Sequence, residues 1–230
     1  MPGFQSDHLW PHIRRFDRTC VGGGLCEEDF GICAELNRYI IIAILGAGNA
    51  GCAVAADLTL KGHEVTLIKT SHAMHDDNFE YMQSHKGEMT LNEFGKVSTA
   101  YIHRVTRDLE ELQDAEIVII YIQTNYHEQL IEKIAPYLQK DQILLINPGY
   151  LSTAYVLKYC QDKPIIVAEA QSSFIDGRVM EPGQFKVGFR NVRNPIGIYP
   201  SSRKEEAIEK LDKLQERFVY LDSVVEAALH

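Results

Sequence analysis

The stretch that decides the fold is IIAILGAGNAGCAVAADLTLKGHEVTLI, residues 41–68. The apolar run Tyr39–Leu45 is typical of a strand buried on both faces of a parallel sheet. A glycine-rich turn follows, and apolar residues then recur at helical spacing over Asn49–Lys61 until Gly62, a helix-stop residue. A second apolar run, Glu64–Ile68, comes next. The sequence therefore predicts a strand–helix–strand unit at the start of a parallel sheet.

The turn between the first strand and the helix reads GAGNAG over residues 46–51 and matches the pattern GxGxxG. In such a turn Gly46 permits the tight bend, Gly48 lets the backbone approach a pyrophosphate, and Gly51 lets the helix pack closely on the strand. Free N–H groups and the positive end of the helix dipole then hold the anion. A purely structural turn is the alternative, but the flanking strand and helix favour dinucleotide binding. The predicted cofactor-binding residues here are Gly46, Gly48, Asn49, Ala50 and Gly51.

The end of the second strand bears on the choice between NAD and NADP. NAD-specific sites place an Asp or Glu there, which binds the ribose 2′-OH. This chain instead has Lys69, Thr70 and Ser71. A cation and two hydroxyls suit a 2′-phosphate through charge-assisted hydrogen bonds. We therefore expect NADP as the preferred cofactor over NAD, the alternative being that Lys69 is only a solvated residue at the end of a strand.

Strands and helices continue to alternate as far as residue 170. This alternation predicts right-handed βαβ crossovers, and with them an α/β fold with a Rossmann-type, doubly wound, mostly parallel sheet. The further strands expected are Lys96–Ile102, Glu116–Ile122, Gln142–Ile146 and Pro164–Ala168, and the further helices are Asp108–Gln113, His127–Leu138 and Ser152–Cys160.

The pattern changes after Ala170. The segments Arg178–Met180 and Gln184–Arg190 flank the sequence EPG at residues 181–183, a turn signal that predicts an antiparallel hairpin. Arg203–Phe218 is charged and periodic, which predicts an amphipathic helix. We therefore expect the parallel sheet to be followed by a C-terminal antiparallel hairpin and helix.

Ligands of open α/β sheets bind outside the carboxyl ends of the strands. Polar side chains follow two of the expected strands at this edge, with Thr124 and Asn125 after one and Asn147 after the next. We predict that these three residues contact the nicotinamide half of the cofactor.

Three further residues are candidates for the chemistry of a substrate. His127 suits a proton donor because the unperturbed pKa of histidine lies near neutrality; the alternative is a structural histidine at the start of a helix. Arg178 suits a substrate carboxylate, or is an ordinary surface arginine of the hairpin. Glu169 suits ligand orientation, or caps a loop.

Composition and charge exclude several classes of partner. The formal net charge is −9, with 23 Lys and Arg against 32 Asp and Glu, whereas domains that bind duplex DNA usually carry the opposite sign. No apolar run approaches the ~20 residues of a membrane-spanning helix. The five cysteines lack CxxC spacing. They predict free thiols in a reducing cytoplasm, and no metal site.

The length of 230 residues corresponds to about one and a half domains at roughly 150 residues each. Residues 1–38 sustain no helical or strand period and are expected to form an irregular N-terminal extension. We expect an NAD(P)-binding Rossmann domain over residues 39–200. Residues 201–230 are expected to be a helical linker and the start of a second domain.

Four segments of residues 39–230 together resemble the octopine/nopaline (opine) dehydrogenase family. They read IIAILGAGNAGCAVAADLTLKGHEVTLIKTS, AEIVIIYIQTNYHEQLIEKIAPYL, QILLINPGY and IVAEAQSSFIDGR. The glycine turn is shared widely among dehydrogenases. The Asn-Pro-Gly and the Ala-Glu-x-Gln that follow two later strands are more discriminating when they occur together.

The resemblance implies an NAD(P)-dependent oxidoreductase that acts on CH–NH bonds. Members of the family reductively condense an amino acid with a 2-oxo acid, and a second, helical domain supplies the catalytic His and Asp. Leu221–His230 resembles the first helix of that second domain, so we expect this chain to be truncated before the rest of the catalytic domain, and whether the fragment is active or inactive stays open. The catalytic pair is left unassigned.

Two other functions stay open from the sequence. One is an enzyme of the ketopantoate reductase or glycerol-3-phosphate dehydrogenase type, and the other is a non-enzymatic NADP(H)-binding module. The partners expected are either a homodimer or a separate chain that supplies the second domain. The residues expected in a homodimer contact are Tyr220, Leu221, Val224 and Val225.

Overall fold

The computed structural model describes residues 39–71 and 76–229, so the predicted N-terminal extension lies outside the described residues. The strands are β1 (Ile41–Leu45), β2 (Glu64–Ile68), β3 (Glu88–Glu93), β4 (Lys96–Tyr101), β5 (Arg104–Thr106), β6 (Ile117–Ile120), β7 (Ile143–Ile146), β8 (Ile166–Ala170), β9 (Ile175–Glu181), β10 (Gln184–Arg190), β11 (Asn194–Tyr199) and β12 (Phe218–Tyr220). The α-helices are α2 (Asn49–Leu60), α3 (Asp76–Ser84), α4 (His127–Ile134), α5 (Thr153–Tyr159), α6 (Lys204–Leu211) and α7 (Val224–Leu229).

The main sheet has eight strands in the order β12-β11-β8-β7-β6-β1-β2-β5. All pairs from β8 to β5 are parallel, and β11 alone runs antiparallel to its neighbour β8. The strand order reverses between β1 and β6, which is where a doubly wound sheet forms its ligand crevice. The predicted α/β class and mostly parallel sheet are confirmed.

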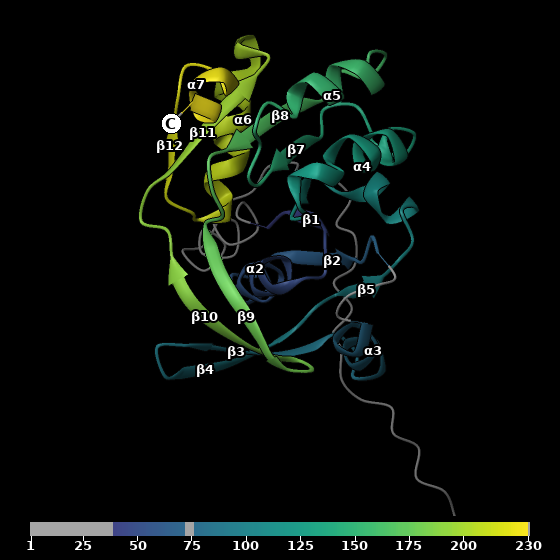
Figure 1. Cartoon of the computed structure of the whole chain (residues 1–230), viewed down its shortest axis with the longest axis vertical. Helices are drawn as coiled ribbons and strands as arrows, with labels where there is room; N and C mark the ends of the chain where they lie inside the picture. Colours follow the sequence, from purple (N-terminus) through teal and green to yellow (C-terminus); the bar gives the residue numbers. More distant parts are fainter. Residues whose placement is uncertain (1–38, 72–75, 230) are drawn as a thin grey trace, which may run out of the picture.

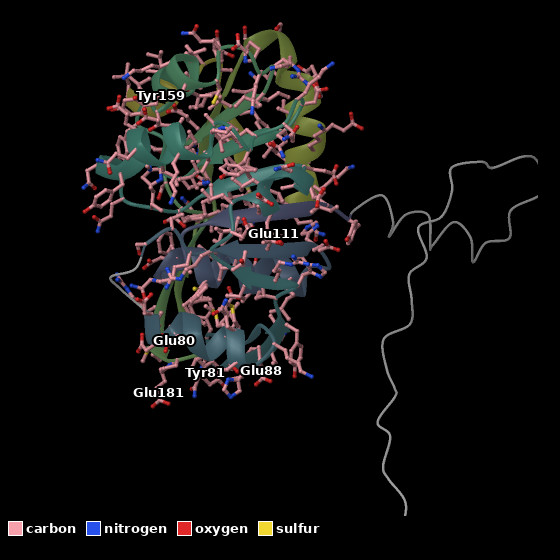
Figure 2. The ribbon with its side chains drawn as sticks, turned by 90° about the vertical axis from the view of Figure 1, so that its right-hand side faces the viewer. Glu80, Tyr81, Glu88, Glu111, Tyr159 and Glu181 are labelled. Carbon is pink, nitrogen blue, oxygen red and sulfur yellow. The ribbon has the colours of Figure 1, made fainter. Side chains whose placement is uncertain are left out.

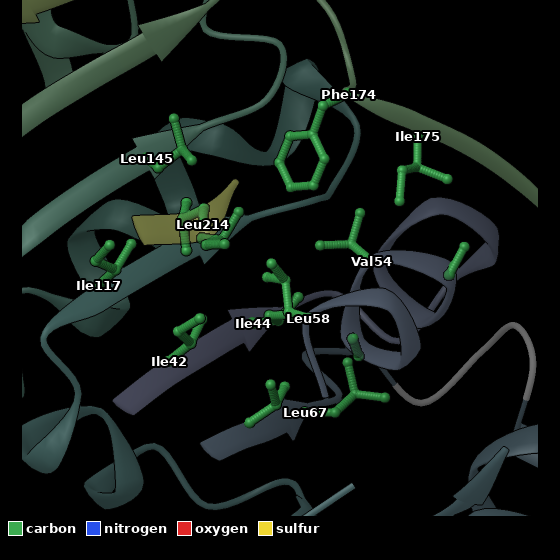
Figure 3. Close-up of a cluster of buried hydrophobic side chains, with 14 of the residues drawn as sticks. Ile42, Ile44, Val54, Leu58, Leu67, Ile117, Leu145, Phe174, Ile175 and Leu214 are labelled. Atoms are coloured by element: carbon green, nitrogen blue, oxygen red, sulfur yellow. The ribbon is translucent and has the colours of Figure 1, made fainter. Parts of the chain in front are cut away.

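The apolar runs read from the sequence are buried on both faces of this sheet. On one face Val54 and Leu58 of α2 pack against Ile42 and Ile44 of β1 (Figure 3). On the other face α4 and α5 cover a second cluster of buried side chains. Each fully buried aliphatic side chain contributes about 1.5–3 kcal/mol, so the two clusters hold the carboxyl edge of the sheet in a fixed geometry.

A second sheet of four strands, in the order β4-β3-β10-β9, packs against α2 (Figure 1). The predicted antiparallel hairpin is confirmed as β9 and β10, and it belongs to this smaller sheet. The expected strand Lys96–Ile102 is also found, but it pairs antiparallel with β3 instead of extending the parallel sheet. That expectation was wrong because β5 takes the place beside β2.

The turn of the β9–β10 hairpin is anchored on α3, a helix that the sequence pattern did not reveal. Gly183 has a φ of +76°, and its N–H donates to Asn78 Oδ1 at 2.9 Å. A Cβ at Gly183 would lie 2.1 Å from the ring of Tyr81. Figure 2 shows Tyr81 and Glu181 at the same end of the molecule. The glycine thus joins the small sheet to α3.

The C-terminal part differs from the single long helix expected over Arg203–Phe218. Helix α6 ends at Leu211, a short 3₁₀ segment follows, and Gln215 has a φ of +56°. This left-handed residue ends the helical segment and lets the chain enter β12, which pairs parallel with β11 at the edge of the main sheet. The helix expected within Leu221–His230 is present as α7. None of the described helices has the length and apolarity to cross a bilayer.

A buried network of charges joins α2 to the small sheet and to the segment before β12. Lys61 Nζ lies 2.9 Å from Asp57 Oδ2 and also pairs with Glu216, whose side chain is only 3% exposed. Arg190 of β10 pairs with Asp57 at 2.7 Å and with Glu93 of β3 at 2.8 Å. Three parts of the chain that are distant in sequence therefore share one set of ion pairs.

Candidate cofactor site

The glycine turn after β1 is packed tightly against β6. Gly46 has a φ of +119°, and a Cβ there would lie 2.2 Å from the carbonyl oxygen of Tyr121. A Cβ at Gly51 would lie 1.8 Å from the carbonyl oxygen of Gly46. The Gly46 N–H donates to the carbonyl of Ile68 at 2.9 Å. The first and last glycines are therefore required for the close approach of β1, α2 and β6.

The middle glycine of the turn faces open space. A Cβ at Gly48 would meet no atom of the described residues within 4 Å. Gly48 is the N-cap residue of α2, and no side chain caps the helix there. The site lies at the switch point between β1 and β6, with the N-terminus of α2 directed at it. This is the geometry that a pyrophosphate needs, because it leaves room beside bare amides at a positive helix end.

The predicted residue Asn49 has a structural bond of its own. Its Oδ1 accepts a hydrogen bond from the N–H of Val179 at 2.9 Å, which fixes β9 against the start of α2. The backbone amides of Asn49 and Ala50 belong to the first turn of α2, whereas the side chain of Asn49 is hydrogen-bonded to the small sheet.

At the end of β2 the structure adds two charged residues to the predicted set. Lys69 is buried, with its Nζ 3.4 Å from Asp76 Oδ1. Arg107, which follows β5, pairs with the same carboxylate at 2.7 Å and donates to the carbonyl oxygen of Ser71. The Arg107 guanidinium lies 4.5 Å from the ring centre of Phe79. Two cations thus bracket one carboxylate beside the predicted ribose position.

Sequence reasoning missed Arg107 and Asp76. The available signal was the parallel pairing of β5 with β2, which places Arg107 beside Lys69 at the carboxyl edge, but β5 is only three residues long and carries no apolar run. Hydrogen bonding from Arg107, and then from Lys69, lowers the pKa of Asp76. Thr70 is half-buried and Ser71 is exposed. A carboxylate is therefore present near the predicted ribose position, and two cations contact it.

The residues predicted for the nicotinamide half lie at the carboxyl ends of β6 and β7. Thr124 and Asn125 are exposed in a 3₁₀ turn after β6. Asn147 is 1% exposed. Neither polar atom of its side chain has a hydrogen-bond partner within residues 39–71 and 76–229. A buried amide without partners is costly, so Asn147 is suited to a polar ligand group that satisfies it.

His127 lies in the interior at the start of α4. Its Nδ1 is 2.7 Å from Ser152 Oγ, and its Nε2 is 3.3 Å from the carbonyl oxygen of Ile122. The Ser152 hydroxyl also donates to the carbonyl oxygen of Gly149 at 2.6 Å. Burial lowers the pKa of His127, so the ring is neutral at pH 7. Both ring nitrogens contact the protein itself, and the role of His127 as a proton donor stays an untested prediction.

Glu169 binds the loop that begins α5. Its Oε2 accepts from the N–H of Leu151 at 2.8 Å, and its Oε1 accepts from the N–H and, at 2.6 Å, from the hydroxyl of Thr153. A Cβ at Gly149 would lie 2.4 Å from the same carboxylate. The side chain therefore holds the loop that follows Asn147, and its predicted role toward a substrate stays untested.

Arg178 lies on β9 of the small sheet. Its side chain is 67% exposed and 3.9 Å from Asp176. The structure does not bring it together with Glu169, which lies in β8 of the main sheet. No group of three or more His, Cys, Asp or Glu among the described residues is arranged to hold a metal ion.

Comparison with known proteins places this geometry in a family. The family model described as Ketopantoate reductase PanE/ApbA matches residues 42–191, from β1 to the end of the small sheet. The chain belongs to this family. Its NAD(P)-binding domain is also similar to an opine dehydrogenase from Arthrobacter sp. (strain 1C), with 24% identity over 81% of this chain and 52% of that protein.

Solved structures agree with this fold. Octopine dehydrogenase with NADH and L-arginine superposes with a TM-score of 0.67 at 16% identity, over 82% of this chain and 50% of that one. A PanE/ApbA family ketopantoate reductase from Ralstonia eutropha JMP134 gives 0.62 at 18% identity, over 80% and 57%. This chain spans about half the length of the opine dehydrogenases that it matches. The predicted resemblance to their NAD(P)-binding domain is confirmed.

Proposed function

We propose that this PanE/ApbA family chain binds NADPH as the cofactor domain of an opine-type oxidoreductase. The observation that carries the proposal is the open space at Gly48, beside the bare N-terminus of α2 at the switch point. In this arrangement the amides of Gly48, Asn49 and Ala50 hold the pyrophosphate, while Gly46 and Gly51 shape the turn.

The choice of NADP over NAD is supported by the cations at the end of β2. Lys69 and Arg107 both contact Asp76, so two cations lie beside the proposed position of the ribose. A 2′-phosphate there is held by charge-assisted hydrogen bonds. Thr70 and Ser71 add hydroxyl donors at the same edge.

The nicotinamide half is proposed to lie over β6 and β7. Asn147 offers both a donor and an acceptor that no described residue satisfies, which suits the carboxamide of a nicotinamide ring. Thr124 and Asn125 are accessible in the turn that follows β6, the strand next to β7. The bound cofactor supplies a hydride, and the side chains named here hold the ring at the carboxyl edge.

Arg107→Gln tests the specificity for the 2′-phosphate. We expect this change to raise the Kd for NADPH about tenfold and to leave the Kd for NADH within about twofold, because only NADPH carries the additional phosphate. The measurement is a titration of each nucleotide followed by nicotinamide fluorescence.

The matched control for this titration is Arg104→Gln. Arg104 lies at the other end of β5 and also pairs with a carboxylate, Glu111, so this variant is expected to bind both nucleotides normally. An equal loss for NADPH and NADH in Arg107→Gln, or tighter binding of NADH by the unmodified chain, would contradict the proposed preference.

The substrates we propose are an amino acid and a 2-oxo acid. Octopine dehydrogenase has been solved with L-arginine and with pyruvate, and the family model points to ketopantoate reductase as the second candidate. Oxidation of NADPH separates the two. The opine type predicts oxidation only when pyruvate and an amino acid are both present. Oxidation with ketopantoate alone would establish the second candidate instead.

A further inference from the structure

A cavity of about 380 Å³ lies at the carboxyl edge of the main sheet, beyond β8. It is lined by Gln171, Arg193, Pro195 and Leu221. Gln171 follows β8 directly, and its N–H donates to the carbonyl oxygen of Pro195 at 2.9 Å. The cavity therefore lies at the same edge as Asn147, one strand further along the sheet.

All the lining side chains of the cavity come from one face of the sheet. Ile196 and Ile198 of β11 lie in the cluster packed under α2. Successive side chains of a strand point to opposite faces, so Pro195 and Gly197 point the other way. On that face a Cβ at Gly197 would lie 2.3 Å from the carbonyl oxygen of Ser223. The cavity thus opens on the face that α7 covers, and not on the charged network under α2.

Arg193 lines this cavity, and Arg217 precedes the neighbouring strand β12. Asn194 is the register partner of Phe218 in the parallel pair of β11 and β12, and the Asn194 N–H donates to the carbonyl oxygen of Arg217 at 2.9 Å. Arg193 and Arg217 precede these partners, so they are neighbours on the same face of the sheet as Pro195, which lines the cavity. Both are exposed.

The two guanidinium groups lack a counterion in the part of the chain that the structure describes, where neither makes an ion pair or a side-chain hydrogen bond. Like charges on neighbouring strands repel each other. An anion between them removes this repulsion, and arginine binds carboxylates through two parallel hydrogen bonds.

The backbone that carries Arg193 is already fixed in place. The N–H of Asn191 donates to the carbonyl oxygen of Phe174 at 2.9 Å, and Asn194 Nδ2 donates to the carbonyl oxygen of Ser172 at 2.8 Å. Little conformational entropy of the backbone is therefore lost when an anion binds, which is the condition for affinity from few contacts.

We propose that this cavity binds the carboxylate of a small 2-oxo acid, with Arg193 and Arg217 as its anion-binding residues. Pro195 and Leu221 form an apolar wall for the short side chain of the acid, and the amide of Gln171 contacts its polar end. The inference rests on the proposed function, and it assigns the 2-oxo acid to residues of the cofactor domain. Gln171 follows β8, the neighbour of β7, so the cavity begins one strand from Asn147.

Isothermal titration of the full chain with pyruvate, with and without saturating NADPH, tests the site. We expect Arg193→Gln and Arg217→Gln each to raise the Kd for pyruvate about tenfold, because each removes a charge-assisted contact. The Kd for NADPH is expected to be unchanged in both variants. Arg104→Gln, on the far side of the sheet, is the matched control and is expected to bind pyruvate normally.

The other outcomes overturn either this assignment or the proposed function. Unchanged pyruvate binding in both variants, or a loss in Arg178→Gln instead, removes the cavity as the site. If inorganic phosphate binds the cavity as tightly as pyruvate does, the site is not selective for a carboxylate and this assignment is contradicted. Binding of NADPH without binding of pyruvate would contradict this inference and leave the proposed cofactor site intact. Binding of pyruvate at Arg193 without binding of NADPH would contradict only the proposed function.

Discussion

Gly48→Asp is expected to weaken NADPH binding by about 100-fold or more while the chain stays folded. A Cβ at Gly48 meets nothing within 4 Å, so the new side chain costs the folded state little. It does, however, occupy the space where the pyrophosphate approaches α2, and its carboxylate repels the phosphates. A loss of this size corresponds to about 2.8 kcal/mol. Fluorescence titration with NADPH and thermal unfolding of the same sample measure both effects.

Gly188→Ala is the matched control for this change. Gly188 lies on β10, and a Cβ there would be 3.4 Å from Asp176, an ordinary van der Waals distance. We expect normal NADPH affinity and normal stability in this variant. Retention of NADPH affinity in a folded Gly48→Asp protein would show that the cofactor does not bind against the glycine turn.

The elements that the sequence predicted well are those whose pattern is local. Continuous apolar runs identified β1, β2, β6, β7 and β8, and the glycines of the turn identified the crossover after β1. The small sheet escaped detection because β3 pairs in parallel with β10, far along the chain. A short amphipathic strand does not reveal which partner it will have, and so Lys96–Ile102 was assigned to the wrong sheet.

The same limit applies to the site. Lys69 and Ser71 follow β2 directly and were predicted from the sequence, but Arg107 reaches the carbonyl oxygen of Ser71 across 36 residues through the pairing of β5. A polar residue at the end of a strand can contact a ligand or form a hydrogen bond within the protein, and the sequence does not show which of the two it does. Asn147 and Glu169 have the same kind of position in the sequence. The structure leaves the first without a partner and engages the second with the loop before α5.

Lys61→Met is expected to lower the free energy of unfolding by about 3–5 kcal/mol at pH 8.5. Lys61 Nζ contacts Asp57, Glu216 and the carbonyl oxygen of Leu214. Without this cation the buried carboxylate of Glu216 keeps only Arg190, 3.8 Å away, and an unpaired buried charge carries a penalty of this size. Urea unfolding followed by circular dichroism measures the loss. Lys186→Met, an exposed lysine on β10, is the control and is expected to change stability by less than about 0.5 kcal/mol.

The cost of Lys61→Met should depend on pH, with a sign fixed by Glu216. Burial, against the opposing effect of Lys61, raises the pKa of Glu216 to about 7, whereas the unfolded value is about 4.3. The folded chain therefore binds the additional proton between these values, and the stability from this group is lost as the pH rises toward 7. At pH 5.5 Glu216 is neutral and needs no counterion, so Lys61→Met should cost less than at pH 8.5.

Combining Lys61→Met with Glu216→Gln separates the effect of Glu216 on this pH dependence from the effects of the other titrating groups nearby. His63 also faces the network, and burial, followed by the nearby charge of Lys61, lowers its pKa, so its protonation destabilises the folded chain at acidic pH. In a Glu216→Gln background, the difference between pH 5.5 and pH 8.5 in the cost of Lys61→Met should disappear, because the group that gains charge is absent. A pH difference that persists in this background would assign the effect to His63 or to Asp57, which also contacts Lys61. An equal cost at both pH values in the unmodified background would show that Glu216 is ionised throughout.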